Sequence, residues 1–175
     1  MSKLTGHWKI TSQAVFELKQ LGQVGAPLNA MALSRLYSQD LATAVIVRDL
    51  TDIVNGGHWG DYGQSHHFMR KFNGQSQFEA YQDGVNWIQK NALLASKKLY
   101  KVITASKEAA EKKQRPEPAF WVGELGFACH AMQDSFADGH ARREMATSNN
   151  APGRITRVLK YAGVDVKNHS HYDQL

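Results

Sequence analysis

The sequence predicts an all-α fold, a single-domain helical bundle that covers residues 1–175. Apolar residues recur at helical spacing along most of the chain, and alternation of apolar and polar residues nowhere persists long enough to predict a sheet. The chain is 42% hydrophobic and 21% charged, which is a globular composition. A chain of this length removes roughly 70% of its unfolded surface from water, so one core is sufficient.

Four segments carry the helical pattern, and Gly or Pro residues separate each from the next. They cover residues 10–21, 28–53, 76–113 and 120–136. Between the second and third, residues 55–74 are rich in Gly, His, Asp and Asn, which predicts an ordered functional loop with a short helical piece at 66–72. A turn at 149–153 precedes a last apolar segment, 155–162.

Eight histidines accompany a single cysteine, Cys129. One thiol excludes an intramolecular disulfide framework and a zinc site built from paired thiolates. A metal would therefore have to be held by imidazoles and carboxylates, which suit catalytic zinc, manganese or iron.

The formal net charge is +5, which favours acidic partners such as nucleic acid or anionic lipid head groups. No segment reaches about eighteen consecutive apolar residues, and the first residues do not lead into the apolar run of a secretory signal. We therefore expect a soluble chain with no transmembrane segment and no visible signal peptide.

The segment from Leu125 to His140 is the most informative part of the sequence. In a helix, His130 and Asp134 lie four residues apart and share one face, so an imidazole and a carboxylate can reach the same ion. Asp138-Gly139 is expected to end the helix and to redirect His140. The same four-residue spacing recurs near the end of the chain, in His169 and Asp173.

Three further candidates lie in the first half of the chain. His7 follows Gly6 and is expected to open the first helix, and the middle segment supplies Asp52 and His67. A single His-x-x-x-Asp pair is most often a structural hydrogen bond. Two such pairs, together with these additional groups, favour a metal site.

This set of residues resembles the superfamily that joins bacterial zinc-dependent phospholipases C with the single-strand-specific zinc nucleases of fungi and plants. The run Leu-Gly-x3-His-x2-Gln-Asp-Ser-Phe-x3-His-x2-Arg, from Leu125 to Arg143, is most similar to the phospholipase C branch. The resemblance implies an all-α bundle that holds two or three zinc ions as a cluster in a cleft. It implies the metal ligands His7, Asp52, His67, His130, Asp134, His140, His169 and Asp173.

Some ligand positions have alternatives. Members of that superfamily also ligate a metal through the α-amino and carbonyl groups of the mature N-terminal residue, usually Trp, five positions before the first His; this chain departs from that pattern, with Ser2 at that position and Met1 before it. Glu144 is an alternative to His169 or Asp173. His66 and Asp49 are alternatives in register to His67 and Asp52.

By this resemblance the chain is expected to be a zinc-dependent phosphodiesterase, most similar to a phospholipase C that hydrolyses the glycerol-side phosphodiester of phospholipids. Asp134 would bridge metals, and Asp52 would orient or deprotonate the attacking water. The side chains expected to meet substrate are Arg142, Arg143, Trp59 and Tyr62.

Two alternatives remain open at this point. The same cluster would serve a zinc nuclease that cleaves single-stranded nucleic acid, or a non-catalytic, metal-stabilised helical binding module. For the phospholipase, the partner is a phospholipid or membrane surface. A small basic phosphodiesterase without a signal of its own would suit an exported bacterial effector or toxin.

Overall fold

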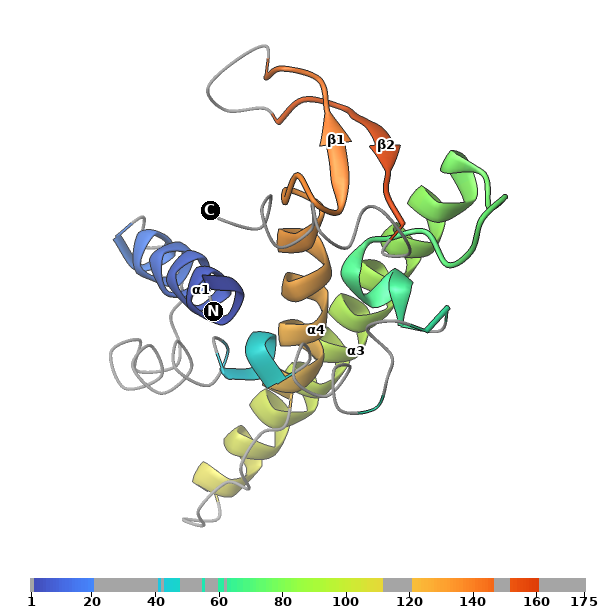
Figure 1. Ribbon diagram of the computed structural model, residues 1–175. Helices are drawn as coiled ribbons and strands as arrows, with labels where there is room; N and C mark the ends of the chain where they lie inside the picture. The colour runs from blue at the N-terminus through green and yellow to red at the C-terminus, as the bar shows by residue number, and fades with distance from the viewer. Residues whose placement is uncertain are drawn as a thin grey trace.

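The computed structural model shows a mostly helical protein, in which α3 and α4 pack side by side (Figure 1). It describes residues 2–20, 41, 43–47, 55, 60–61, 63–111, 121–146 and 152–160. The elements within these ranges are α1 (Ser2–Gln20), η1 (Gln64–His67), α3 (Gln77–Glu111), α4 (Trp121–Asp134), β1 (Ala141–Arg143) and β2 (Ile155–Val158). The expectation of a mainly helical fold is confirmed.

The long helix α3 begins where the sequence predicts, and a capping box fixes its start. The Ser76 hydroxyl accepts a hydrogen bond from the Glu79 backbone N–H at 3.1 Å, and the Ser76 N–H donates to the Glu79 carboxylate at 3.0 Å. These two bonds satisfy donors that have no partner within the helix. The backbone N–H of Ser76, and its side chain to a lesser extent, also lower the pKa of Glu79, because hydrogen bonds to the carboxylate favour its ionised form.

The first helix is longer than predicted. It begins at Ser2, eight residues before Ile10, so His7 lies in its second turn and does not open it. Residues 2–9 lack a clear apolar stripe, and Gly6 suggested a helix start. A Cβ at Gly6 would meet nothing within 4 Å, so no close packing requires a glycine there.

Residues 41 and 43–47 are the described part of the predicted segment 28–53, and they are helical. They pack against α4 at Gly126, where a Cβ would lie 2.5 Å from the Ala44 Cβ. Gly126 therefore permits a close approach that any larger residue would prevent.

The expectation that the chain forms no sheet is wrong. Strands β1 and β2 pair antiparallel, with Ala141 opposite Val158, and the register shifts between Arg142 and Arg143. Strands of three and four residues are too short to give a detectable period of two, so the pattern missed them. The predicted apolar segment 155–162 contains β2.

A small core joins the hairpin to α3 through Phe68, the residue that follows η1. Phe68 is buried with Ala80, Ala141 and Val158. Its ring lies on Gly84 of α3, where a Cβ would come within 2.5 Å of Phe68 Cδ2. Phe68 has a φ of 54°, in the left-handed region, so the chain turns sharply directly after His67.

Candidate metal centre

Four imidazoles converge on the carboxylate of Asp134. Its Oδ2 lies 3.0 Å from His67 Nδ1, 3.1 Å from His130 Nε2 and 3.7 Å from His140 Nδ1. Its Oδ1 lies 3.2 Å from His7 Nε2. We call these five residues the His/Asp cluster.

The fold assembles this cluster from segments that are far apart in the sequence. α4 carries His130 and Asp134 on one face, as their four-residue spacing requires. α1 contributes His7, and η1 contributes His67; both elements contact α4. α4 ends at Asp134, and the turns from 135 to 140 bring His140 back to the cluster.

All members of the cluster are buried except His7, whose side chain is 13% exposed. An ionised carboxylate in a buried site needs cationic partners or hydrogen-bond donors to remain charged. Burial opposes ionisation of Asp134, but the charges of His140 and His130 and the hydrogen bonds from His130 and His67 hold its pKa well below the usual value.

The surroundings of the His130 imidazole favour its neutral form. Burial lowers the pKa of His130, and this effect outweighs the opposing influence of Asp134; His67 and His7 lower it further. A neutral imidazole has a lone pair available, which is the form in which histidine binds metals. The buried His130 Nδ1 has no hydrogen-bond partner in the part of the chain that the structure describes.

Gln133 orients the His7 ring. Its amide nitrogen donates to the Thr11 hydroxyl at 2.9 Å, so its oxygen faces His7 Nδ1 at 2.7 Å. His7 Nδ1 is therefore the protonated nitrogen, and the Nε2 lone pair faces Asp134 Oδ1. Two acceptors that face each other at 3.2 Å require a cation or a proton between them.

His140 differs from His7, because its nitrogen nearest Asp134 is the one that also binds the protein. Its Nδ1 donates to the main-chain carbonyl of His67 at 2.6 Å, which leaves Nε2 as the acceptor nitrogen. A hydrogen bond from one ring nitrogen to a carbonyl or carboxylate is the usual support for a metal-binding histidine.

The donor set fits a metal ion. His7, His130 and Asp134 offer ligand atoms within 4.8 Å of one another, so this group could hold a metal ion. His67 Nδ1 and His130 Nε2 are 3.0 Å apart. Ligand atoms around a tetrahedral zinc ion are separated by about 3.3 Å, close to this spacing.

The structure distinguishes His67 from its neighbour His66. His67 contacts Asp134, whereas the buried His66 ring lies on Trp87, with 3.9 Å between the ring centroids. The sequence left open which of these two histidines belongs to the site, and the structure places His67 in the cluster.

The residues that follow His140 belong to the hairpin. Arg143 donates to the Ser135 carbonyl and hydroxyl and to the Gly153 carbonyl, at 2.8 to 3.1 Å. The Arg142 guanidinium lies 3.6 Å from the Asp138 carboxylate. Glu144, the alternative ligand, is exposed and pairs with Arg154 at 2.9 Å. Phosphate binding by Arg142 or Arg143 remains a prediction.

The remaining predicted site residues lie outside the described ranges. They are Asp49, Asp52, Trp59, Tyr62, His169 and Asp173. Their assignments stay predictions. The sequence did not predict the supporting roles of Gln133 and Thr11, although Gln133 directly precedes Asp134 in the conspicuous motif.

None of the described helices is long and apolar enough to cross a membrane. Comparison of the chain with protein-family models, with curated proteins and with solved structures gives no match.

Proposed function

We propose that this chain is a zinc-dependent phosphodiesterase, and that its substrate is a phospholipid. The observation that carries the proposal is the convergence of four imidazoles on one buried carboxylate, Asp134. A metal ion would account for this arrangement, because with a neutral His7 both the Nε2 lone pair and the facing Asp134 oxygen are acceptors that a cation can satisfy.

The two Asp134 oxygens face different sets of ligands. Oδ1 faces His7, and Oδ2 faces His67 and His130, so the carboxylate can bridge two cations. Bound zinc lowers the pKa of a coordinated water to about 7 and polarises a phosphoryl oxygen. The protein holds the imidazoles in place through Gln133 and the His67 carbonyl. Asp52 is proposed to orient the attacking water or take its proton.

The choice of phospholipid rests on the similarity of the run Leu125 to Arg143 to the phospholipase C branch. The net charge of +5 favours the alternative, cleavage of single-stranded nucleic acid. We give the motif more weight, because a positive net charge is common to many unrelated proteins.

The test incubates zinc-loaded protein separately with phosphatidylcholine vesicles and with single-stranded DNA. We expect release of diacylglycerol and intact DNA. The opposite result would replace the phospholipase with a nuclease. Absence of both activities, with zinc bound, would leave a metal-stabilised binding module, and absence of zinc by elemental analysis would reject the metal centre.

Two aspartate variants distinguish the proposed metal ligand from a carboxylate on the surface. Asp134→Asn should lose bound zinc and activity together, while Asp138→Asn, four residues further along and 65% exposed at its side chain, should retain both. Asp52→Asn should retain zinc and lose activity, which a purely structural metal site would not predict.

A further inference from the structure

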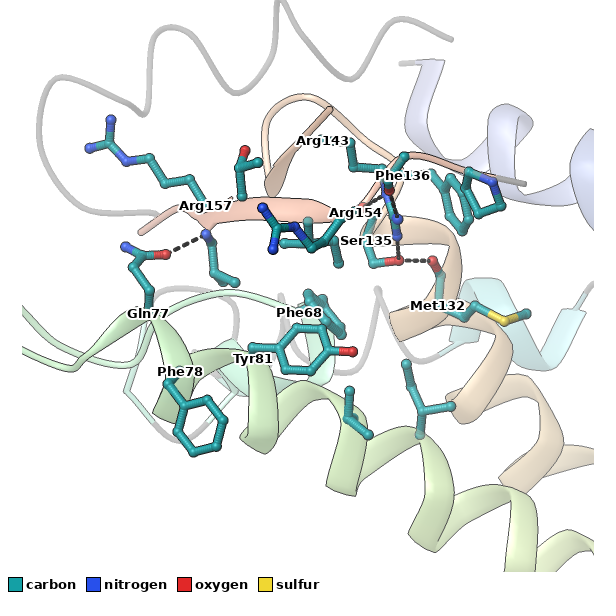
Figure 2. Close-up of a pocket in the computed structure, with 17 residues that line it drawn as sticks. Phe68, Gln77, Phe78, Tyr81, Met132, Ser135, Phe136, Arg143, Arg154 and Arg157 are labelled. Carbon is teal, nitrogen blue, oxygen red and sulfur yellow. Dashed lines mark hydrogen bonds between the residues drawn. The ribbon is translucent and has the colours of Figure 1, made fainter. Parts of the chain in front are cut away.

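A second concave site lies between α3 and the β1–β2 hairpin (Figure 2). Its volume is about 680 Å³, within the range of small-molecule sites. The lining includes Phe68 and Ser135, the chain neighbours of His67 and Asp134. Figure 2 shows Phe68, Phe78 and Tyr81 on one wall, with the hairpin on the other.

Large apolar side chains are unusually exposed in this pocket. Phe78 is 71% exposed, Phe136 48%, Met132 46% and Tyr81 39%, and all four belong to the lining. Exposed apolar groups gathered at one concave site indicate a binding surface rather than scattered surface residues.

Most polar groups of the lining are already used within the protein. The Ser135 hydroxyl donates to the Met132 carbonyl, and the Thr156 hydroxyl donates to the Arg142 carbonyl. The Gln77 side-chain oxygen accepts from the Val158 N–H at 2.6 Å. An occupant therefore finds mainly apolar contact here.

The charge of the lining is positive. It contains Arg143, Arg154 and Arg157, and no acidic side chain among the described residues. The three nitrogens of the Arg143 guanidinium donate within the protein, and Arg154 pairs with Glu144. Arg157 is exposed and has no ion pair within the described part of the chain, so it and Arg154 add positive charge to the hairpin wall of the pocket.

We propose that this pocket binds a long-chain fatty-acid anion, with the acyl chain between α3 and the hairpin and the carboxylate near Arg154 and Arg157. An acyl chain brings no polar group that would need a partner inside the pocket. The carboxylate is complementary to the cationic charge of Arg157, which has no ion pair among the described residues. This inference goes beyond the proposed phosphodiesterase and does not depend on the metal.

A peptide fits this pocket less well. Its backbone amides would need hydrogen-bond partners, because buried N–H and C=O groups are rarely left unpaired. The outer edge of β2 is already occupied there, since Val158 N–H donates to Gln77 and the Leu159 carbonyl accepts from Arg70. A bilayer surface fits less well because the pocket has two facing walls (Figure 2), which suit one chain.

The test is calorimetric titration of the full chain with dodecanoate below its micelle concentration, in the presence of a chelator. The chelator removes any metal that could bind the carboxylate, so the result is independent of the proposed phosphodiesterase. We expect saturable binding of one dodecanoate per chain, and at least tenfold weaker binding of dodecyltrimethylammonium, which has the same chain and a cationic head.

Two pairs of variants localise the binding. Phe78→Ser should weaken dodecanoate binding about tenfold, while Tyr100→Ser, on the same helix and 72% exposed but outside the pocket, should not change it. Arg157→Glu should weaken binding similarly, and Lys97→Glu should leave it unchanged.

Absence of saturable dodecanoate binding would overturn the proposal, as would equal affinity for the cationic amphiphile or equal loss in Phe78→Ser and Tyr100→Ser. Binding to anionic vesicles but not to monomeric dodecanoate would assign the pocket to a membrane surface and would also overturn it.

Discussion

The His/Asp cluster and the apolar pocket meet at the C-terminal end of α4, and they differ in how their polar groups are used. In the cluster, buried nitrogens and oxygens face one another at 3.0 to 3.7 Å. In the pocket, most polar groups bind each other and apolar surface is left exposed. The first arrangement suits a cation, and the second suits an acyl chain.

Consecutive residues serve the two sites. His67 contacts Asp134 while Phe68 lines the pocket, and Asp134 holds the imidazoles while Ser135 lines the pocket. At both places, one residue therefore belongs to the charged site and the next residue in the chain belongs to the apolar one. Substitutions that affect only the cluster, only the pocket, or both sites test how closely the two are connected.

The largest expected effect is on the cluster alone. Asp134→Ala removes the only carboxylate that the structure places among these imidazoles, and should lower the free energy of unfolding by about 3 kcal/mol, because it leaves buried polar groups without their partner. Chemical denaturation of the metal-free protein measures this. Asp138→Asn, on the exposed turn, should stay within about 0.5 kcal/mol of the parent.

A glycine substitution should disturb both sites. In Gly84→Ala the new Cβ would lie 2.5 Å from the Phe68 ring, so the ring must move and His67 with it. We expect a loss of about 2 kcal/mol in unfolding free energy from overpacking, together with weaker zinc and dodecanoate binding.

Gly123→Ala is the matched control for Gly84→Ala. It also lies in a helix, but its Cβ would meet nothing within 4 Å. We expect it to stabilise the protein by about 0.5 kcal/mol and to leave both ligands unaffected. A destabilisation equal to that of Gly84→Ala would contradict the role given to the Phe68 contact.

Substitutions at Gln133 test the orientation of His7 without removing a proposed metal ligand. Gln133→Leu removes the acceptor that orients His7 Nδ1 and should weaken zinc binding about tenfold, measured by competition with a chromophoric chelator. Gln133→Glu keeps an oxygen for Nδ1 and should restore most of the affinity. Gln82→Leu, on α3, should have no effect; equal losses at both positions would reject an orienting role.

The smallest effect concerns the first turn of α3, which carries Phe78. The pKa of Glu79 lies below 4.5 because Ser76 bonds to its carboxylate form, so this contribution to stability is present above pH 4.5 and is lost as the pH falls through the lowered value. Ser76→Ala keeps the backbone N–H and removes only the hydroxyl, so it should raise the pKa of Glu79 part of the way towards 4.5, as an NMR titration of its carboxyl carbon would show. Ser96→Ala should leave that titration unchanged.

The sequence predicted best what depends on spacing within one helix. The His130–Asp134 pair needs only the helical repeat, and it is found as predicted. The change of direction before His140 followed from Asp138-Gly139, although the helix itself ends at Asp134. The start of α3 followed from the helical pattern that begins at residue 76, and the structure adds the capping box formed by Ser76 and Glu79.

What the sequence did not predict depends on contacts between distant segments or on short elements. The hairpin is stabilised by Arg143, which binds Ser135 and Gly153, and no local pattern reveals such a contact. The choice of His67 over His66 depends on how η1 docks beside Trp87 of α3. The orienting role of Gln133 required the position of α1.

Phe68 restricts which substitutions the pocket can accept without affecting the cluster. Its left-handed conformation costs about 1 kcal/mol in a residue with a side chain, and glycine would remove that cost. Glycine would also remove the ring that fills the space above Gly84 and lines the pocket. A change of pocket shape at this position therefore also shifts His67. Redesign of ligand preference should begin at Phe78 or Met132, which line the pocket and are separated from the cluster residues by at least one position in the chain.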